Sequence, residues 1–181
     1  MYNKMNKAKE ENIEKVLNEL FVKPTNKYHI RELARLTGLN PNTIITIVNM
    51  LEKQDTVVKI EKKHIVEVYL NFENKMVISK KRFFNIKKFN ESGIINYLEE
   101  QFNNPEAIVL YGSYSNGLDL EKSDIDVVIV SKMKKEVNLE KYEKLFGRNI
   151  HLLVFSREKI PKELFNSLIN GIVVSGYLSN E

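Results

Sequence analysis

Apolar side chains recur at helical spacing through the first part of the chain. Residues 13–21 place Ile, Val, Leu and Phe on one stripe, and Pro24 is expected to end this first helix. A short second helix is expected over residues 30–36. The turn "TGLNPNT" follows, in which Asn40 is a good N-cap and Pro41 suits the first position of a third helix. The pattern therefore predicts three helices in succession.

The next residues change to the pattern of strands. "TVVKI" and "HIVEVYLNF" are expected to form two strands around the charged turn "EKK". Residues 73–103 then predict two more helices, of which the first, "ENKMVISKKRFFNIKKF", is basic. We expect the apolar side of this basic helix to consist of Met76, Val77, Phe83 and Phe84.

From residue 107 the pattern alternates between strands and helices. The expected strands are "AIVLY", "DIDVVIV", "NIHLLVF" and "IVVSGYL", and the expected helices are "NLEKYEKLFG" and "REKIPKELFNSLING". This order predicts an α/β (α+β) fold with a small mixed sheet after the helical first part. We expect an N-terminal domain over residues 1–75, a helical connector over 76–91 and the mixed domain over 92–181.

Charge divides the chain in the same way. Residues 1–90 carry 18 Lys and Arg against 10 Asp and Glu, a net charge of +8, whereas residues 91–181 carry 10 against 14, a net charge of −4. A basic domain favours a polyanionic partner, and an acidic one often contains metal-binding carboxylates. The alternative interpretation is a solvated surface on which charge is unevenly spread.

Several classes of protein are disfavoured by composition. The chain has no cysteine, which excludes disulfides and thiolate metal sites. No window approaches the length of a membrane span, and the first residues do not resemble a signal peptide. We therefore expect a cytoplasmic protein without membrane contact.

The candidate chemistry lies in "YGSYSNGLDLEKSDIDVVIV", residues 111–130. Because strand residues alternate in direction, Asp124 and Asp126 are expected to share a face, where they repel one another unless a cation lies between them. Oxygen ligands of this kind suit Mg²⁺. Gly112 leaves room for a phosphate, and Ser113 offers a hydroxyl and backbone amides at a helix start. These features predict a nucleoside-triphosphate site, to which Ser123 is also assigned. The alternative is a turn in which Ser123 and Asp124 only cap a helix and begin a strand.

Gly112-Ser113, ten further residues and then Asp124-x-Asp126 resemble the signature of the DNA polymerase beta superfamily, and most closely its minimal prokaryotic nucleotidyltransferases. The resemblance covers roughly residues 92–178. It implies that Ser113 contacts the triphosphate and that Asp124 and Asp126 bind Mg²⁺. It also implies transfer of a nucleoside monophosphate to a hydroxyl or similar acceptor. In some toxin–antitoxin pairs that acceptor is a residue of a partner protein.

One position departs from the superfamily pattern. A third carboxylate usually lies on a neighbouring strand, and here the matching position in Ile-His-Leu holds His151. Imidazole is a poor ligand for Mg²⁺ but an acceptable one for Mn²⁺, and it can act as a general base. His151 is therefore either a substitute catalytic base or an ordinary strand histidine. Asp119 and Glu121 are unconvincing replacements for the missing carboxylate.

The pattern of residues 29–60 resembles the core of archaeal and bacterial winged helix-turn-helix domains. The resemblance implies that the third helix reads DNA and that the turn between the strands holds phosphates. The implied DNA-binding residues are Asn42, Thr43, Thr46, Asn49, Lys53, Lys62 and Lys63. The helix face has no Arg, and Ile45 on it fits a second interpretation, in which this domain contacts protein or dimerises.

Two functions remain open from the sequence. The first is a Mg²⁺-dependent nucleotidyltransferase, with Mn²⁺ as an alternative metal, a DNA-binding winged helix and a protein acceptor of toxin–antitoxin type among its partners. The second is a DNA-binding transcriptional regulator whose transferase domain is degenerate and binds only nucleotide or partner. A homodimer is compatible with either function.

Overall fold

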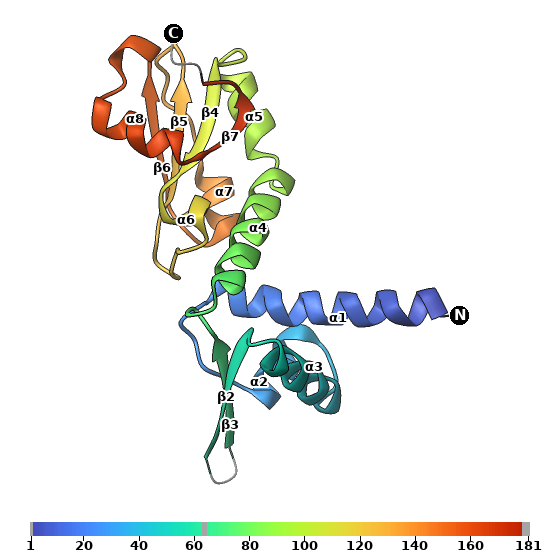
Figure 1. Cartoon of the computed structure of the whole chain (residues 1–181). Helices are drawn as coiled ribbons and strands as arrows, with labels where there is room; N and C mark the ends of the chain where they lie inside the picture. Colours follow the sequence, from blue (N-terminus) through green and yellow to red (C-terminus); the bar gives the residue numbers. More distant parts are fainter. Residues whose placement is uncertain (1, 63–64, 179–181) are drawn as a thin grey trace. The chain divides into compact units, whose positions relative to one another are not determined.

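The computed structural model describes residues 2–62 and 65–178 (Figure 1). The chain divides into two compact units, Met1–Ile78 and Ser79–Glu181. None of the helices in the described part is long and apolar enough to cross a membrane.

The first unit combines helices with a small antiparallel sheet. Its elements are α1 (Tyr2–Val22), β1 (Tyr28–His29), α2 (Ile30–Thr37), α3 (Pro41–Lys53), β2 (Val57–Lys62) and β3 (Ile65–Leu70). The three helices and the β2–β3 hairpin agree with the sequence pattern. The short strand β1 was not expected, and it pairs antiparallel with β3 to give the order β1-β3-β2. Asn40 caps α3 as expected, because its side chain accepts a hydrogen bond from the backbone N–H of Asn42 at 2.9 Å.

Helix α4 (Lys75–Glu91) begins in the first unit and continues into the second. The expected apolar side of this helix is wrong in two of its four residues, because Met76 is 61% exposed and Phe83 is 69% exposed. The buried positions are instead four residues apart and include two polar side chains. They are Val77, Lys81, Asn85 and Phe89. The sequence pattern failed here because a buried lysine and asparagine interrupt the apolar stripe.

The second unit is an α/β layer structure. Its elements after α4 are α5 (Ile94–Gln101), β4 (Ala107–Tyr111), α6 (Gly112–Asn116), β5 (Ile125–Val130), α7 (Glu140–Phe146), β6 (Ile150–Phe155), the 3₁₀ turn η1 (Arg157–Lys159), α8 (Lys162–Ile169) and β7 (Ile172–Gly176). The sheet has the order β6-β5-β4-β7. β4 pairs antiparallel with β5 and β7, while β5 and β6 are parallel, so the expected mixed sheet is confirmed.

Both faces of this sheet are covered, which explains why β4 and β5 are apolar along most of their length, with Asp126 of β5 as the charged exception. Ile108 and Leu110 of β4 pack in a core with α4, α5 and α7. The alternate residues Ala107 and Val109 pack with Leu168 of α8 on the other face. In Figure 1 the helices α4 and α5 lie on one side of the strands and α8 on the other.

Candidate active site

The turn from β4 into α6 brings Gly112 against Asp126. Gly112 has φ +72°, in the left-handed region that favours glycine. Its strand neighbour Tyr111 is the register partner of Asp126 on β5. A Cβ atom built on Gly112 would overlap the Asp126 carboxylate, and Oδ2 would be its nearest neighbour. Glycine is therefore required here by both its backbone conformation and the position of Asp126.

Ser113 is the second residue of α6 and is half-buried. Its backbone carbonyl accepts a hydrogen bond from the N–H of Leu118 at 3.0 Å, which folds the loop back after the helix. Gly117 ends α6 in the left-handed conformation. Within the described chain, the Ser113 hydroxyl has no hydrogen-bond partner, and it is therefore able to donate to a ligand.

Asp126 lies on the second position of β5, beside His151 of the parallel strand β6. The two residues are register partners, and His151 Nδ1 is 3.3 Å from Asp126 Oδ1. The Asp126 side chain is 26% exposed and that of His151 is 55% exposed. The strand therefore places imidazole and carboxylate side by side at an accessible end of the sheet. Tyr111 faces the same region, where its burial, and secondarily the charge of Asp126, raise the pKa of its phenol.

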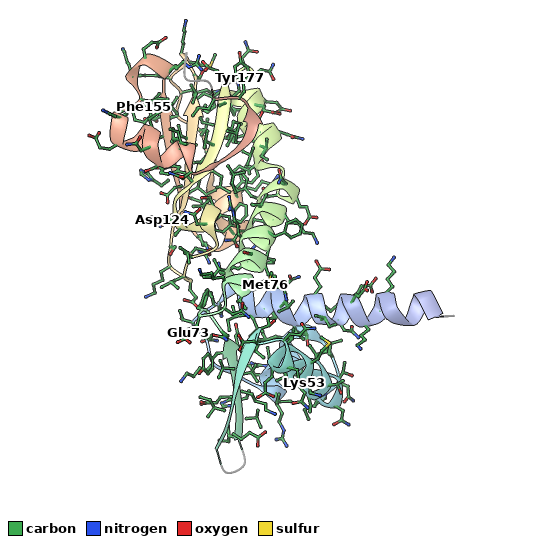
Figure 2. The ribbon with its side chains drawn as sticks, viewed as in Figure 1. Lys53, Glu73, Met76, Asp124, Phe155 and Tyr177 are labelled. Carbon is green, nitrogen blue, oxygen red and sulfur yellow. The ribbon has the colours of Figure 1, made fainter. Side chains whose placement is uncertain are left out.

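Asp124 lies one residue before β5 and is exposed, at the position labelled in Figure 2. The alternation argument thus applies to Asp126 within the strand, while Asp124 is placed by the preceding turn. In that turn the Ser123 hydroxyl accepts a hydrogen bond from the Leu120 backbone N–H at 3.0 Å. The Asn149 amide donates to Asp124 Oδ1 at 3.3 Å. Ser123 shapes the turn that presents Asp124, and its assignment as a nucleotide ligand stays a prediction.

The two carboxylates fit a hard divalent cation. Within residues 2–62 and 65–178, neither Asp124 nor Asp126 forms an ion pair with a lysine or arginine, so their charge is not already neutralised. Mg²⁺ usually takes one or two protein carboxylates together with phosphate oxygens and water. No group of three or more His, Asp or Glu able to hold a metal occurs among the described residues. A metal held here would therefore draw its remaining ligands from substrate and solvent.

Asp119 is not a third metal ligand. Its side chain is fully buried and forms ion pairs with Lys81 and with Arg148. Asn85 donates to Asp119 Oδ1 at 2.6 Å. Sequence reasoning missed this cluster, because the burial of Lys81 and Asn85 on α4 is not visible in the pattern of apolar residues. The four residues Lys81, Asn85, Asp119 and Arg148 are called the Asp119 cluster below.

A hollow of about 430 Å³ opens beside Asp124. Its lining includes Asp124, Asn149 and the cationic residues Lys122, Lys144 and Arg148. Glu121, Glu140 and Glu143 also contribute, so the hollow has mixed charge. It is large enough to accept part of a nucleotide or of an acceptor group next to Asp124.

The residues expected to bind DNA are only partly accessible. Asn42, Thr46, Asn49 and Lys53 on α3 are exposed, whereas Thr43 is half-buried. The remaining two, Lys63 and the side chain of Lys62, lie outside the described residues.

Asn49 is already engaged within the protein. Lys59 Nζ donates to Asn49 Oδ1 at 3.1 Å and forms ion pairs with Glu52 and Glu61 at 3.3 and 3.2 Å. Beside these residues lies a cavity of about 890 Å³ between α2, α3 and the β2–β3 hairpin. Its lining is mainly apolar and includes Ile45, which is 44% exposed. This surface is therefore less basic than the net charge of the first ninety residues indicated.

Comparison with known families identifies the second unit. Residues 91–174 match the family described as "Nucleotidyltransferase domain". This range begins at the end of α4 and includes Gly112, Ser113, Asp124 and Asp126. The expected nucleotidyltransferase domain is thus confirmed, while the winged helix stays a prediction. No curated protein and no solved structure matches the chain.

Proposed function

We propose that the second unit transfers a nucleoside monophosphate from a nucleoside triphosphate to an acceptor hydroxyl, with release of pyrophosphate. The observation that carries this proposal is the contact between Gly112 and Asp126 within a segment that matches a nucleotidyltransferase domain. It joins the turn that presents the Ser113 hydroxyl to the strand that presents a carboxylate. A phosphate-binding group and a metal-binding group then lie next to one another, as transfer from a nucleotide requires.

Asp124 and Asp126 would hold Mg²⁺, which nucleotidyltransferases typically use, and which would neutralise charge on the phosphates and the departing pyrophosphate. Ser113 donates its hydroxyl hydrogen bond to a phosphate oxygen. Ser123 keeps Asp124 at the mouth of the site through the turn that its hydroxyl closes. These side chains act by positioning and by electrostatics, and none forms a covalent bond to the nucleotide.

His151 takes the role of general base in this proposal. When its Nδ1–H donates to Asp126, the second ring nitrogen of the neutral imidazole is an acceptor. The imidazole is exposed and can reach the hydroxyl of an acceptor that approaches this end of the sheet. It removes the acceptor proton as the oxygen attacks the α-phosphorus. Carboxylate oxygens also suit Mn²⁺, which is therefore a suitable alternative to Mg²⁺.

The first unit is proposed to be a winged helix that brings the transferase to DNA. Three helices followed by a hairpin support this, as do the exposed polar residues Asn42, Thr46 and Lys53 of α3. Glu52 and Glu61 lie close to that surface, where they repel phosphates. We therefore expect weak, salt-sensitive binding that depends on few phosphate contacts.

The second candidate function is a DNA-binding regulator whose transferase domain binds nucleotide or a partner without turnover. The observation that favours it is the absence, among the described residues, of a three-residue acidic or histidine cluster. A toxin-like protein acceptor belongs to the first function, and either function is compatible with a homodimer in the cytoplasm.

Calorimetric titration tests the nucleotide site directly. Each nucleoside triphosphate is titrated into the wild type with Mg²⁺ and then Mn²⁺, and the titration is repeated with Asp126→Asn. Glu106→Gln is the matched control, because it neutralises a carboxylate at the opposite end of β4. We expect metal-dependent binding in the wild type and the control but not in Asp126→Asn. Equal binding by all three proteins would refute the proposed site.

Turnover separates the two functions. The protein is incubated with a nucleoside triphosphate labelled at the α-phosphate and with protein or nucleic acid added as acceptor. Label on the acceptor measures transfer, and the pyrophosphate released is detected separately. Pyrophosphate release that Asp126→Asn abolishes supports the enzyme. Binding of DNA by both proteins without pyrophosphate release supports the regulator.

A further inference from the structure

The Arg148 guanidinium connects two groups of the loop that leads to Asp124. Its side chain is only 7% exposed. Nη2 lies 2.9 Å from Asp119 Oδ2, and Nη1 donates to the backbone carbonyl of Ser123 at 3.2 Å. The ring of Tyr114 lies against the same group, with 5.6 Å between the guanidinium carbon and the ring centroid. The guanidinium is therefore held by a carboxylate, a carbonyl and an aromatic face.

The two residues of the Arg148–Ser123 hydrogen bond are each followed in the chain by a residue of the candidate metal site. Ser123 immediately precedes Asp124 in the chain. Asn149 immediately follows Arg148, and its amide donates to Asp124 Oδ1 at 3.3 Å. Asp124 lies outside β5 and so lacks the ladder hydrogen bonds that fix Asp126. The segment 148–149 thus supports Asp124 at its backbone and at its carboxylate.

Asp119 gives this contact a fixed anchor. Its side chain is fully buried, and Oδ1 accepts hydrogen bonds from Lys81 Nζ and Asn85 Nδ2 of α4. Asn85 also donates to the backbone carbonyl of Tyr114 at 2.9 Å. A carboxylate shared by two cations and an amide in the protein interior has little freedom to move. An arginine paired with it is held far more firmly than one in an exposed ion pair.

We propose that Arg148 is a positioning residue that fixes Asp124 in the geometry needed to bind a divalent cation. This inference rests on the proposed metal role of Asp124 and Asp126. Arg148 acts by bridging Asp119 to the Ser123 carbonyl, while its neighbour Asn149 orients the carboxylate itself. Supporting groups of this kind change the metal affinity of the ligands that they orient.

Arginine is required for the bridge because its two terminal nitrogens reach two acceptors at once. A lysine offers a single nitrogen on a flexible stem and keeps only the positive charge. Arg148→Lys therefore removes the bridge while it conserves charge. Lys81→Met is the matched variant, since it removes the other buried cation of the Asp119 cluster, and in the described part of the chain Lys81 makes no hydrogen bond or ion pair with residues 123–124.

The test measures the affinity of each protein for Mn²⁺ in the absence of nucleotide. Electron paramagnetic resonance reports the concentration of the unbound ion. Circular dichroism first establishes a temperature at which each variant is folded. We expect Asp126→Asn to lose the site and Arg148→Lys to bind Mn²⁺ about tenfold more weakly than the wild type. Lys81→Met is expected to lower the melting temperature while its Mn²⁺ affinity stays that of the wild type. Asp119→Asn, which loses the anchor, is expected to weaken Mn²⁺ binding as Arg148→Lys does.

The outcomes distinguish this inference from the function beneath it. Wild-type affinity in both Arg148→Lys and Asp119→Asn would overturn the positioning role and leave the metal site standing. Equal weakening in Arg148→Lys and Lys81→Met would also overturn it, because the cluster would then act only through stability. Mn²⁺ binding that Asp126→Asn does not reduce would overturn both the inference and the proposed site.

Discussion

The Asp126 carboxylate occupies the space that a side chain on Gly112 would need. The two residues come from β5 and from the turn after β4, and the antiparallel register of Tyr111 with Asp126 brings them together. The role that the sequence predicts for this glycine is to leave room for a phosphate. The structure gives it a second role, because it lets a carboxylate lie directly against the backbone that carries Ser113.

Gly112→Ala is therefore expected to displace Asp126 as well as to strain the backbone. Gly93 provides a matched control, since it has φ +78° and an added Cβ would meet no atom within 4 Å. Each substitution costs about 1–2 kcal/mol for a side chain in the left-handed conformation. Only Gly112→Ala should also abolish metal-dependent nucleotide binding. Urea unfolding and calorimetric titration measure the two effects, and equal nucleotide affinity in both variants would contradict the role assigned to the contact.

The orientation of α4 gives a prediction about stability. Phe89 is fully buried against Phe146, with ring centroids 6.0 Å apart, whereas Phe83 is 69% exposed. Phe89→Ala is expected to lower the free energy of unfolding by about 3–5 kcal/mol, while Phe83→Ala changes it by less than about 0.5 kcal/mol. Chemical denaturation of the two variants checks this orientation. A larger loss of unfolding free energy in Phe83→Ala than in Phe89→Ala would instead support the apolar side that the sequence predicts.

These residues show why part of the structure could be predicted from sequence. The turn at Gly112 and the strand at Asp126 are local patterns, and the following strand placed His151 in the matching position. The Asp119 cluster could not be predicted, because Lys81 and Asp119 are 38 residues apart and their pairing depends on how α4 packs. Lysine is ordinarily assigned to the surface, so from sequence Lys81 belongs to the basic residues of this helix and not to its core.

Burial of Lys81 gives a pH dependence. Desolvation lowers the pKa of this lysine below its ordinary value of 10.5, despite the opposing effect of Asp119, and Arg148 lowers it further. The unfolded chain therefore binds more protons than the folded one at pH values between the folded-state pKa and 10.5. Across this interval the contribution of Lys81 to stability rises with pH, and below it the cost of the buried charge is fully present.

Comparison with Lys81→Met isolates this effect. The tyrosines Tyr111, Tyr114 and Tyr142 have raised pKa values and reduce stability in alkaline solution, but they are present in both proteins. We expect the unfolding free energy of the wild type minus that of Lys81→Met to increase as pH approaches 10.5. Urea titrations at a series of pH values measure this difference. A difference that is constant with pH would show that Lys81 has the same pKa in both states.

The pair Asp126–His151 predicts a change of metal preference. His151→Asp replaces a ring nitrogen with carboxylate oxygens at a position whose Nδ1 lies 3.3 Å from Asp126 Oδ1. Mg²⁺ prefers oxygen ligands, and imidazole is a poor ligand for it but an acceptable one for Mn²⁺. We expect the ratio of Mg²⁺ to Mn²⁺ affinity to rise by about tenfold, equivalent to about 1.4 kcal/mol. Competition between the two ions, followed by paramagnetic resonance of Mn²⁺, measures this ratio.

His29→Asp is the control for this prediction, because His29 is an exposed histidine of the first unit and precedes α2, where aspartate is a good N-cap. It adds the same charge to the protein without approaching Asp126. The metal ratio of this variant should equal that of the wild type. If His151→Asp also leaves the ratio unchanged, the imidazole does not contribute to the metal site. Its contact with Asp126 would then serve to orient the two side chains, and the proposed general-base role, which needs a ring nitrogen without a metal, would stand.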